Sequence, residues 1–285
     1  MKKSIKYILV MAVATTMAFI SCEDHEILYQ NISTSVEGSA FIQVFYFVPV
    51  TATSSNYVYK IGINGIDYVN DGAEMITTYS IAPYYSSSYP GKYYTVDPGT
   101  VNLKLYISSD MELAYDVDFE LEAGYWNVCV YDFNADPVIF ETGYPFEGNS
   151  TYDTDTVSHV MFVNFMWEDD DSYCEQKILY QYRWIDDDDN YTEWRNVGDY
   201  IGFAENTGWQ ELIVYKTTYN SSGSRRLYFR LLDEDGEVLQ KWNSKGVLTN
   251  YSDYWTHYIG RYSYHVLAGK RCGTPIASER NFYAL

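Results

Sequence analysis

The sequence predicts an all-β protein made of two immunoglobulin-like, antiparallel β-sandwich modules that follow an N-terminal export signal. Residue types that suit half-buried pleated surfaces are abundant, and Tyr alone accounts for 32 of the 285 residues. Short runs of alternating polar and apolar residues recur between turn residues, whereas no long stretch of the mature chain has a helical period. Short strands at this spacing are typical of β-sandwiches.

The first 21 residues have the composition of a secretory signal peptide. Three lysines precede an almost wholly apolar run, residues 7–20, which is short for a membrane span. A membrane anchor is the alternative, but no stop-transfer charge pattern follows the run. The junction Ala18–Cys22 (AFISC) resembles the lipobox of bacterial lipoproteins, although Leu or Val is commoner where Ala18 or Phe19 stands.

In that family the Cys thiol is the nucleophile that accepts diacylglycerol, and cleavage then frees the amine for a further acyl chain such as palmitate. The resemblance therefore implies that Cys22 is lipidated and is the first residue of the mature chain. Two or three acyl chains give a stable membrane anchor where one would be marginal. We expect residues 22–37 to form a polar tether between this anchor and the first module.

An acidic cluster follows the lipidation site directly, at Glu23, Asp24 and Glu26. It resembles the surface-export signal of Bacteroidota lipoproteins, which implies anchoring in the outer membrane and display at the cell surface. The alternative is a solvated acidic tether on the periplasmic face of the same membrane.

The formal net charge of −20 limits the partners that the protein can have. Removal of the three signal-peptide lysines would change it from −20 to −23. A chain this acidic lacks the basic footprint that nucleic acid requires, so we expect no nucleic-acid partner. The charge suits a soluble, repelling extracellular surface.

The first module is predicted to span residues 38–142. Asn64-Gly65 lies between two apolar runs, and this dipeptide favours a two-residue hairpin turn. In residues 114–124 apolar and acidic residues alternate, which predicts a strand with one solvated face. The strand-forming segments are residues 39–50, 56–69, 95–107, 114–124 and 125–133.

Two turns in this module carry a family resemblance. Pro98-Gly99 precedes an outward strand, and Ala123-Gly124 precedes a final Tyr-containing strand. With these turns, residues 39–140 resemble the bacterial domain family of unknown function numbered 4397, which consists of small β-sandwich modules of exported proteins. The resemblance implies a β-sandwich and offers no catalytic residues. The second half of the chain lacks the Pro-Gly turn.

A linker rich in Gly, Pro, Ser, Thr and Asp is predicted at residues 143–158, and the second module at residues 159–285. Both halves open with an aromatic strand and end near a Gly that precedes another aromatic strand, which indicates a divergent duplication. Asp233–Gly236 should form an acidic hairpin turn. The strand-forming segments are residues 159–167, 177–184, 209–216, 225–232, 237–242 and 262–269.

No motif in the sequence indicates catalysis, so we expect no catalytic residue, cofactor or metal site. The sequence lacks H-E-x-x-H, G-x-S-x-G, phosphate-loop and dinucleotide-binding patterns. His257 and His265 lie in Tyr-rich strands, which favours ordinary packing roles. Acidic runs at residues 168–171, 186–189 and 233–236 lack the ligand spacing of an EF-hand, so we interpret them as solvated turns.

Two pairs of residues are candidates for special roles. Cys174 and Cys272 lie in loop-like sequence near the two ends of the second module, where an oxidising compartment would allow a disulfide between them. Cys129 should pack as a small apolar residue. Trp194 and Trp209 lie beside Gly-, Asn- and Thr-rich turns, which makes them candidates for an exposed ligand platform.

The sequence as a whole predicts a non-enzymatic, lipid-anchored envelope protein with a structural, adhesive or protein-interaction role. The alternative is a glycan-binding accessory lipoprotein of a nutrient-uptake system. An exposed, coplanar pair of aromatic rings in the second module would favour the alternative. A continuous edge strand or an apolar end face would favour adhesion or assembly.

Overall fold

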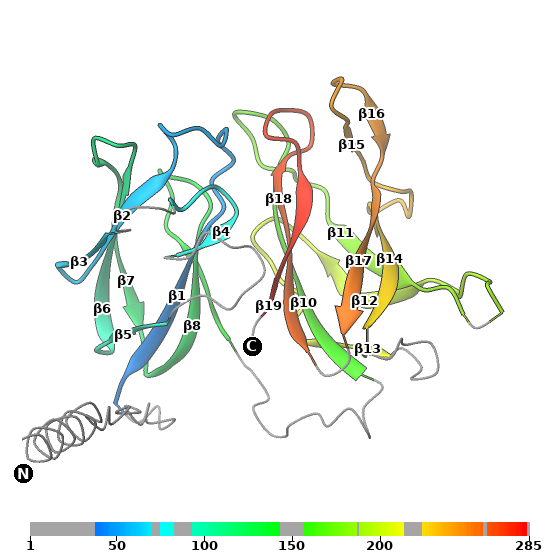
Figure 1. Ribbon diagram of the computed structural model, residues 1–285, viewed down its shortest axis with the longest axis horizontal. Coiled ribbons are helices and arrows are strands. Elements are labelled where there is room, and N and C mark those ends of the chain that lie inside the picture. The colour runs from blue at the N-terminus through cyan, green and yellow to red at the C-terminus, as the bar shows by residue number, and fades with distance from the viewer. Residues whose placement is uncertain are drawn as a thin grey trace, which may run out of the picture. The chain divides into compact units, whose positions relative to one another are not determined.

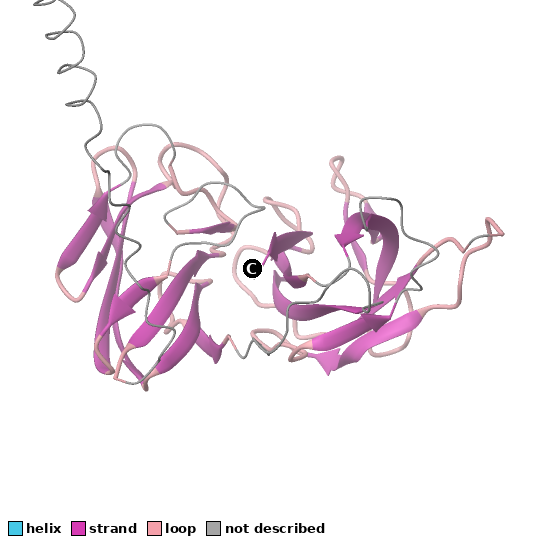
Figure 2. Cartoon of the chain, turned by 60° about the horizontal axis from the view of Figure 1, so that its bottom comes forward, coloured by secondary structure: helices cyan, strands magenta, loops and turns pink. Residues whose placement is uncertain are grey.

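The computed structural model describes residues 38–69, 75–82, 93–142, 157–186, 188–213, 224–258 and 261–283. Every regular element in these ranges is a β-strand, as Figure 1 and Figure 2 show, which confirms the all-β fold class. Across the same ranges, no helix has the length and apolarity that crossing a bilayer requires. The predicted signal peptide and tether, residues 1–37, lie outside the described residues.

The first sandwich consists of two sheets, which we call the inner and the outer sheet (Figure 1). The inner sheet has the strand order β4-β1-β8-β9, with β5 also paired to β1, and the outer sheet has the order β3-β2-β6-β7. The strands are β1 (Ala40–Tyr46), β2 (Val58–Ile63), β3 (Ile66–Val69), β4 (Ser80–Ile81), β5 (Tyr94–Val96), β6 (Gly99–Ile107), β7 (Glu112–Leu121), β8 (Gly124–Val130) and β9 (Val138–Glu141).

The second sandwich has an inner sheet of order β13-β10-β18-β19 and an outer sheet of order β12-β11-β14-β17. A separate hairpin, β15-β16, is inserted between β14 and β17. The strands are β10 (Val157–Trp167), β11 (Ile178–Arg183), β12 (Arg195–Ile201), β13 (Gln210–Ile213), β14 (Ser224–Leu232), β15 (Gln240–Trp242), β16 (Leu248–Asn250), β17 (Ser252–Tyr258), β18 (Tyr262–Lys270) and β19 (Ser278–Tyr283).

The two sandwiches have the same topology apart from β5 and the β15-β16 hairpin, each of which occurs in only one of them. The order β4-β1-β8-β9 corresponds to β13-β10-β18-β19, and β3-β2-β6-β7 corresponds to β12-β11-β14-β17. In each inner sheet the first strand runs parallel to a late strand, β1 to β8 and β10 to β18, while the other strand pairs are antiparallel. A parallel pair is possible here because long connections, not hairpins, separate the two strands. The shared topology supports the hypothesis of a divergent duplication.

Local turn chemistry places the first hairpin. Asn64 and Gly65 have positive φ angles of 49° and 79°, and Ile63 pairs with Ile66 across them. These angles are those of a two-residue hairpin turn, so the predicted hairpin is confirmed. The boundary of the predicted linker differs slightly, because β10 begins at Val157. The remainder of the linker, residues 143–156, lies outside the described residues.

The outer and inner sheets differ in how many faces they bury. In β7 the side chains of Tyr115 and Leu121 belong to the core of the first sandwich, whereas Asp116 on the alternate face is exposed. In β1, by contrast, Val44 lies in that core while the adjacent Phe45 is buried on the opposite face. Strands that are buried on both faces need apolar residues at consecutive positions, which explains the long apolar runs of β1 and β10.

The second face of each inner sheet packs against the other sandwich. Phe47 stacks on Phe165 at 5.3 Å, and Phe45 meets the edge of Phe282 at 5.7 Å. Residues 36–285 accordingly form one compact unit. We call the buried residues shared by the two sandwiches the interface cluster: Phe45, Phe47, Tyr79, Ile81, Cys129, Met161, Val163, Phe165, Tyr264, Val266, Ala268 and Phe282.

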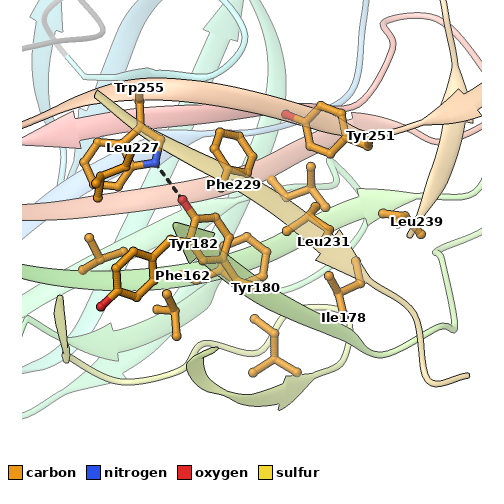
Figure 3. Close-up of a cluster of buried hydrophobic side chains, with 14 of the residues drawn as sticks. Phe162, Ile178, Tyr180, Tyr182, Leu227, Phe229, Leu231, Leu239, Tyr251 and Trp255 are labelled. Atoms are coloured by element: carbon orange, nitrogen blue, oxygen red, sulfur yellow. Dashed lines mark hydrogen bonds between the residues drawn. The ribbon is translucent and has the colours of Figure 1, made fainter. Parts of the chain in front are cut away.

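The second sandwich also has its own core between its two sheets. Figure 3 shows the rings of Tyr180, Phe229 and Trp255 among aliphatic side chains. Tyr180 stacks on Phe229 at 5.3 Å, and the Trp255 indole donates a hydrogen bond to the Tyr180 hydroxyl. Both partners thus satisfy their polar atoms inside the core, which buried Tyr and Trp generally require.

Candidate ligand-binding face

Trp194 lies against the outer sheet of the second sandwich. The chain between β11 and β12 turns back along the end of β11, where Ile185 bridges to Tyr191. Thr192 fixes this return, because its N–H donates to the Trp184 carbonyl at 2.9 Å and its hydroxyl accepts from the Trp184 N–H at 3.1 Å. These contacts place Tyr191 and Trp194 beside the side chains of β11 and β14.

Two arginines contact the Trp194 ring. The guanidinium carbon of Arg183 lies 4.3 Å from the ring centroid, and that of Arg230 lies 4.4 Å from it. Arg183 also lies over Tyr191 at 4.0 Å. Cation–π contacts of this kind each contribute about 0.5–2 kcal/mol and hold the planar guanidinium groups in place. The ring therefore serves as a support for two fixed cations.

The register of the sheet extends this arrangement into a face. Paired residues in neighbouring strands point to the same side, and alternate residues along a strand share that side. Arg183 pairs with Tyr228, and Tyr228 pairs with Tyr254. We define the arginine–aromatic face as Gln181, Arg183, Asn196, Arg226, Tyr228, Arg230, Ser252, Tyr254 and Thr256 of the sheet, together with Tyr191 and Trp194.

Hydrogen bonds orient part of this face. Arg230 Nε donates to the Gln181 side-chain oxygen at 2.9 Å, and the Gln181 amide donates to Asn196 at 2.7 Å. Arg226 lies over the ring of Tyr254 at 4.3 Å. Tyr191 and Tyr254 remain 51% and 53% exposed, so ring surface is available to a partner. The face is therefore ordered and partly solvent-accessible.

The sign of the charge on this face is opposite to that of the chain. None of its members is acidic, although the sequence holds 39 acidic against 19 basic residues. The ion pairs found in the described part of the chain do not involve Arg183, Arg226 or Arg230. Burial, together with repulsion from Arg183, lowers the pKa of Arg230. The arginines therefore present positive charge without a carboxylate partner from the face.

Trp209 lies in a different place from Trp194. Its ring contacts Tyr262 and Tyr264 of β18, and it packs half-buried against the interface cluster. Its indole N–H donates to the Thr142 carbonyl of the first sandwich at 2.7 Å. The structure thus does not bring the two predicted platform residues together. Trp194 lies against the outer sheet of the second sandwich, and Trp209 joins the two sandwiches.

The three acidic runs share one local geometry. The first Asp of each turn, Asp169, Asp186 or Asp233, accepts hydrogen bonds from backbone N–H groups two to four residues further on. Such side-chain bonds stabilise turns by satisfying backbone donors that have no strand partner. Within the described ranges, no group of three His, Cys, Asp or Glu side chains is arranged to hold a metal ion.

Cys174 and Cys272 are free thiols in this structure, and both lie beside Glu168. Glu168 forms a two-point ion pair with Arg271, at 2.6 and 2.5 Å. Arg271 holds the pKa of the Glu168 carboxyl below its usual range, and both thiols add hydrogen bonds to it. The predicted disulfide stays a prediction. Cys129 is buried in the interface cluster, which confirms its packing role.

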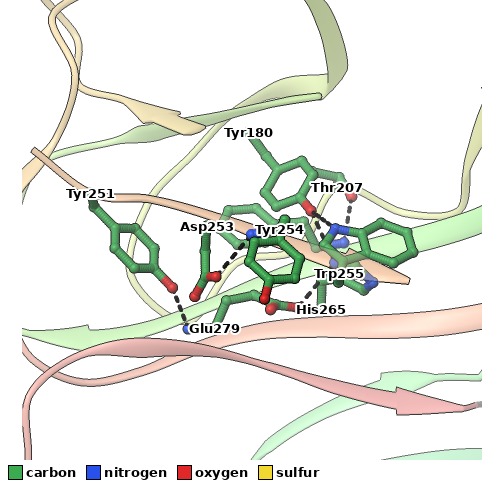
Figure 4. Close-up of polar contacts among 9 residues, drawn as sticks. Tyr180, Thr207, Tyr251, Asp253, Tyr254, Trp255, His265 and Glu279 are labelled. Carbon is green, nitrogen blue, oxygen red and sulfur yellow. Dashed lines mark hydrogen bonds and ion pairs between the residues drawn. The ribbon is translucent and has the colours of Figure 1, made fainter. Parts of the chain in front are cut away.

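The buried histidines make polar contacts that the sequence does not predict. Nδ1 of His265 lies 3.0 Å from the Tyr180 hydroxyl and 3.0 Å from a Glu279 carboxylate oxygen, as Figure 4 shows. The second distance is within ion-pair range, although this carboxylate oxygen has no hydrogen-bond partner among the described residues. His257 contacts the Ser158 hydroxyl. The sequence predicts ordinary packing for both histidines, and these polar contacts arise because strands distant in sequence bring the groups together.

Both histidines are closed off from solvent, which limits their access to a substrate. His265 and His257 are 0% and 2% exposed. Burial, with a smaller contribution from repulsion by His265, lowers the pKa of His257 to about 3. The imidazole of His257 is therefore neutral, and its contact with the Ser158 hydroxyl satisfies a buried polar group. The cluster therefore has the features of a structural network in the core.

No family model matches the sequence, and no curated protein is significantly similar to it. The resemblance of residues 39–140 to the domain family of unknown function 4397 therefore stays a hypothesis.

The arginines of the face were not recognised from the sequence, although a signal is present. In the segment RRLYFRLL, Arg226, Tyr228 and Arg230 occupy every second position, which in a strand places them on one side. Their alternation with buried Leu227 and Phe229 marks the solvent side of a half-buried strand. Arg183 and Trp194 could not be added to this set without the strand register.

Proposed function

We propose that the protein is a non-enzymatic, lipid-anchored protein of the outer membrane, displayed at the cell surface, which adheres to a partner through the arginine–aromatic face. One observation carries the proposal. Three arginines and four aromatic rings share a face without acidic members in a chain of net charge −20. Stacked guanidinium groups are suited to recognising carboxylate, sulfate or phosphate groups with two hydrogen bonds each.

The composition of the face also supports binding. Arginine and aromatic residues are enriched where proteins contact partners, whereas acidic side chains are depleted there. The guanidinium groups of Arg183 and Arg230 are already positioned on Trp194, so binding would immobilise few additional side chains. The absence of catalysis is part of the proposal, and the full burial of His257 and His265 supports it.

The anchor is a separate part of the proposal and rests on the junction at residues 18–22. Cys22→Ala should abolish lipidation and release or mis-sort the protein, because no other thiol stands at a lipobox. Intact-mass analysis of the protein extracted from membranes is the measurement. A mature N-terminus other than a diacylated Cys22 would contradict the anchor without affecting the proposal for the face.

The face is tested with the soluble chain that begins at Glu23. Arg183→Gln with Arg230→Gln removes two positive charges from the face, whereas Lys60→Gln with Lys104→Gln removes two from the outer sheet of the first sandwich. We expect adhesion of the chain to envelope fragments to fall by about tenfold in the arginine variant only. Equal loss in both variants would show that overall charge, and not this face, governs adhesion.

The second candidate function is a glycan-binding accessory lipoprotein of a nutrient-uptake system. The exposure of Tyr191 and Tyr254 beside amide and hydroxyl side chains favours it. The ring pairs on the face are not coplanar, however, since Tyr191 meets Tyr228 at 78° and Tyr228 meets Tyr254 at 55°. Binding of the soluble chain to neutral oligosaccharides on a glycan array would favour this candidate.

A further inference from the structure

We infer that the partner of the arginine–aromatic face is a polysaccharide that carries carboxylate or sulfate groups. This inference rests on the proposed function, because it names the chemical class of the partner for the same face. Three features carry it: the row of cations, the rings between them, and the neutral polar side chains that complete the face.

The cations form a row that suits a repeating anion. Arg226 and Arg230 are four residues apart on one side of β14, which corresponds to about 13 Å along the strand. Arg183 of β11 lies opposite Tyr228, at a position between these two arginines. Each guanidinium group is held over a ring, at 4.3–4.4 Å from Tyr254 or Trp194. A polymer with an acidic group on successive units can contact several of these cations at once.

Aromatic rings occupy the positions between the cations. Tyr228 separates Arg226 from Arg230 on β14, and it contacts both Tyr191 and Tyr254. Tyr191 and Tyr254 are each about half exposed. Apolar ring faces beside polar groups suit the C–H surfaces of pyranose units, which present hydroxyls at their edges. The alternation along β14 therefore matches a polymer that alternates anionic groups and sugar rings.

The remaining members of the face favour a sugar over an acidic polypeptide. They are amides and hydroxyls, which both donate and accept hydrogen bonds as sugar hydroxyls require: Gln181, Asn196, Ser252 and Thr256. Leu179 and Leu232 continue the same side of the sheet but are only 6% and 7% exposed. The centres of protein–protein interfaces are generally more apolar than this.

The test measures binding of the soluble chain from Glu23 onward to immobilised polymers. Polygalacturonate and alginate supply carboxylates, a sulfated galactan supplies sulfates, dextran is the neutral control, and poly-L-glutamate is the acidic polypeptide. We expect binding to at least one acidic polysaccharide, weaker binding to poly-L-glutamate, and none to dextran. Binding should weaken as salt rises, because the contacts are electrostatic and exposed. Comparison of polygalacturonate and alginate with the sulfated galactan shows whether carboxylate or sulfate is the recognised group.

Variants locate the binding on the face. Arg183→Gln with Arg230→Gln should weaken it by tenfold or more, and Tyr254→Ser by several-fold, whereas Lys60→Gln with Lys104→Gln should leave it unchanged. Arg230→Lys keeps the charge but loses the planar fork, so it should fall between wild type and Arg230→Gln. Far-ultraviolet circular dichroism and urea unfolding check the fold of each variant. If the double variant fails to fold, Arg226→Gln replaces it, since that side chain is exposed.

Three results would overturn the inference. They are equal or tighter binding to poly-L-glutamate, binding to acidic polysaccharide that the arginine variants do not weaken, and binding to none of the acidic polysaccharides. If the last result accompanied arginine-dependent adhesion to envelope fragments, the proposed function would stand while the partner class would be wrong. If adhesion itself were independent of the arginines, the proposed function would fail as well.

Discussion

The outer sheets of the two sandwiches occupy equivalent positions in the topology, yet their solvent faces differ in charge. On the first, Lys60 pairs with Asp67 at 3.0 Å and Lys104 with Asp116 at 3.0 Å. The Asn102 side-chain amide donates hydrogen bonds to both Asp116 and Asp118. The outward positions of β6 and β7 hold neither Arg nor Trp. On the second, three arginines lie on rings without an acidic neighbour in the face.

This difference shows which part of a shared sandwich topology can vary. The inward side chains must keep apolar character, because the buried surface supplies most of the folding free energy. Surface substitutions away from special contacts usually change stability by less than about 0.5 kcal/mol, so the outward face can change freely. On the first sandwich, the outward lysines are neutralised by ion pairs with aspartates. On the second sandwich, the outward positions form the arginine–aromatic face that we propose as a binding site.

The largest expected effect tests whether the two sandwiches are one folding scaffold. Phe47→Ala removes a fully buried ring that contacts Phe165 and Phe282 of the second sandwich. The lost contacts and the cavity should lower the free energy of unfolding by about 3–5 kcal/mol in urea titrations. Tyr254→Ala, on the exposed face, is the control and should lower it by no more than about 1–2 kcal/mol, through the lost contacts with Arg226 and Tyr228. Similar values for the two variants would contradict a stabilising interface.

The next effect concerns a pair of cysteines, Cys174 and Cys272, that the second sandwich contains and the first lacks. An oxidised Cys174–Cys272 bond would close a long loop and should raise the free energy of unfolding by roughly 3–5 kcal/mol over the reduced chain. Unreduced peptide mapping of the exported protein detects the bond, and unfolding with and without reductant measures its effect. Cys272→Ser prevents the bond at a half-buried position, so it should remove the difference between the two conditions. Alkylation of both Cys174 and Cys272 in the exported protein would rule the bond out.

A pH effect should belong to the second sandwich through His257. Its pKa is lowered to about 3 by burial and, to a smaller extent, by His265, whereas an unfolded histidine has a pKa of about 6.5. Between these values the unfolded chain binds one more proton, so stability falls as the pH falls, by about 1.4 kcal/mol per pH unit. From about pH 7.5 to about pH 5.5, wild type should therefore lose about 1.4 kcal/mol more than His257→Gln. Parallel pH profiles for the two proteins would contradict the lowered pKa.

The smallest effect concerns the ion pairs of the first sandwich. Lys60→Gln removes the contact with Asp67 and the stacking of the lysine on Tyr106 at 3.7 Å. An exposed pair of this kind should be worth less than about 1 kcal/mol, and less still at high salt. Urea unfolding at low and high salt measures it. A larger loss of unfolding free energy that does not depend on salt would contradict the interpretation of this contact as an exposed ion pair.

Several local features follow from neighbouring residues alone. The Asn64-Gly65 turn depends on two residues that accept positive φ, and the solvated face of β7 depends on strict alternation along one strand. The apolar surroundings of Cys129 within its strand predict burial, which the structure confirms. The acidic turns at Asp169, Asp186 and Asp233 are local as well, because each carboxylate binds backbone donors of its own loop.

The candidate site was only partly accessible from sequence. Trp194 was identified because it lies beside polar turn residues, and the same argument selected Trp209, which joins the two sandwiches through Thr142. Proximity to a turn does not say which face of a sheet a side chain reaches or whether another sandwich covers it. That depends on contacts between residues far apart in the chain, 67 positions in the case of Trp209 and Thr142.

The sequence by itself determined the all-β class, the hairpin at Asn64-Gly65 and the alternation of the outer strands, because each depends on residues within a few positions of one another. Only the tertiary structure decided the parallel pairing of β1 with β8 and of β10 with β18. It also decided the contact of Arg183 and Arg230 with Trp194. The register between distant strands, which the packing of two cores selects, places these groups together, and no local pattern encodes that register.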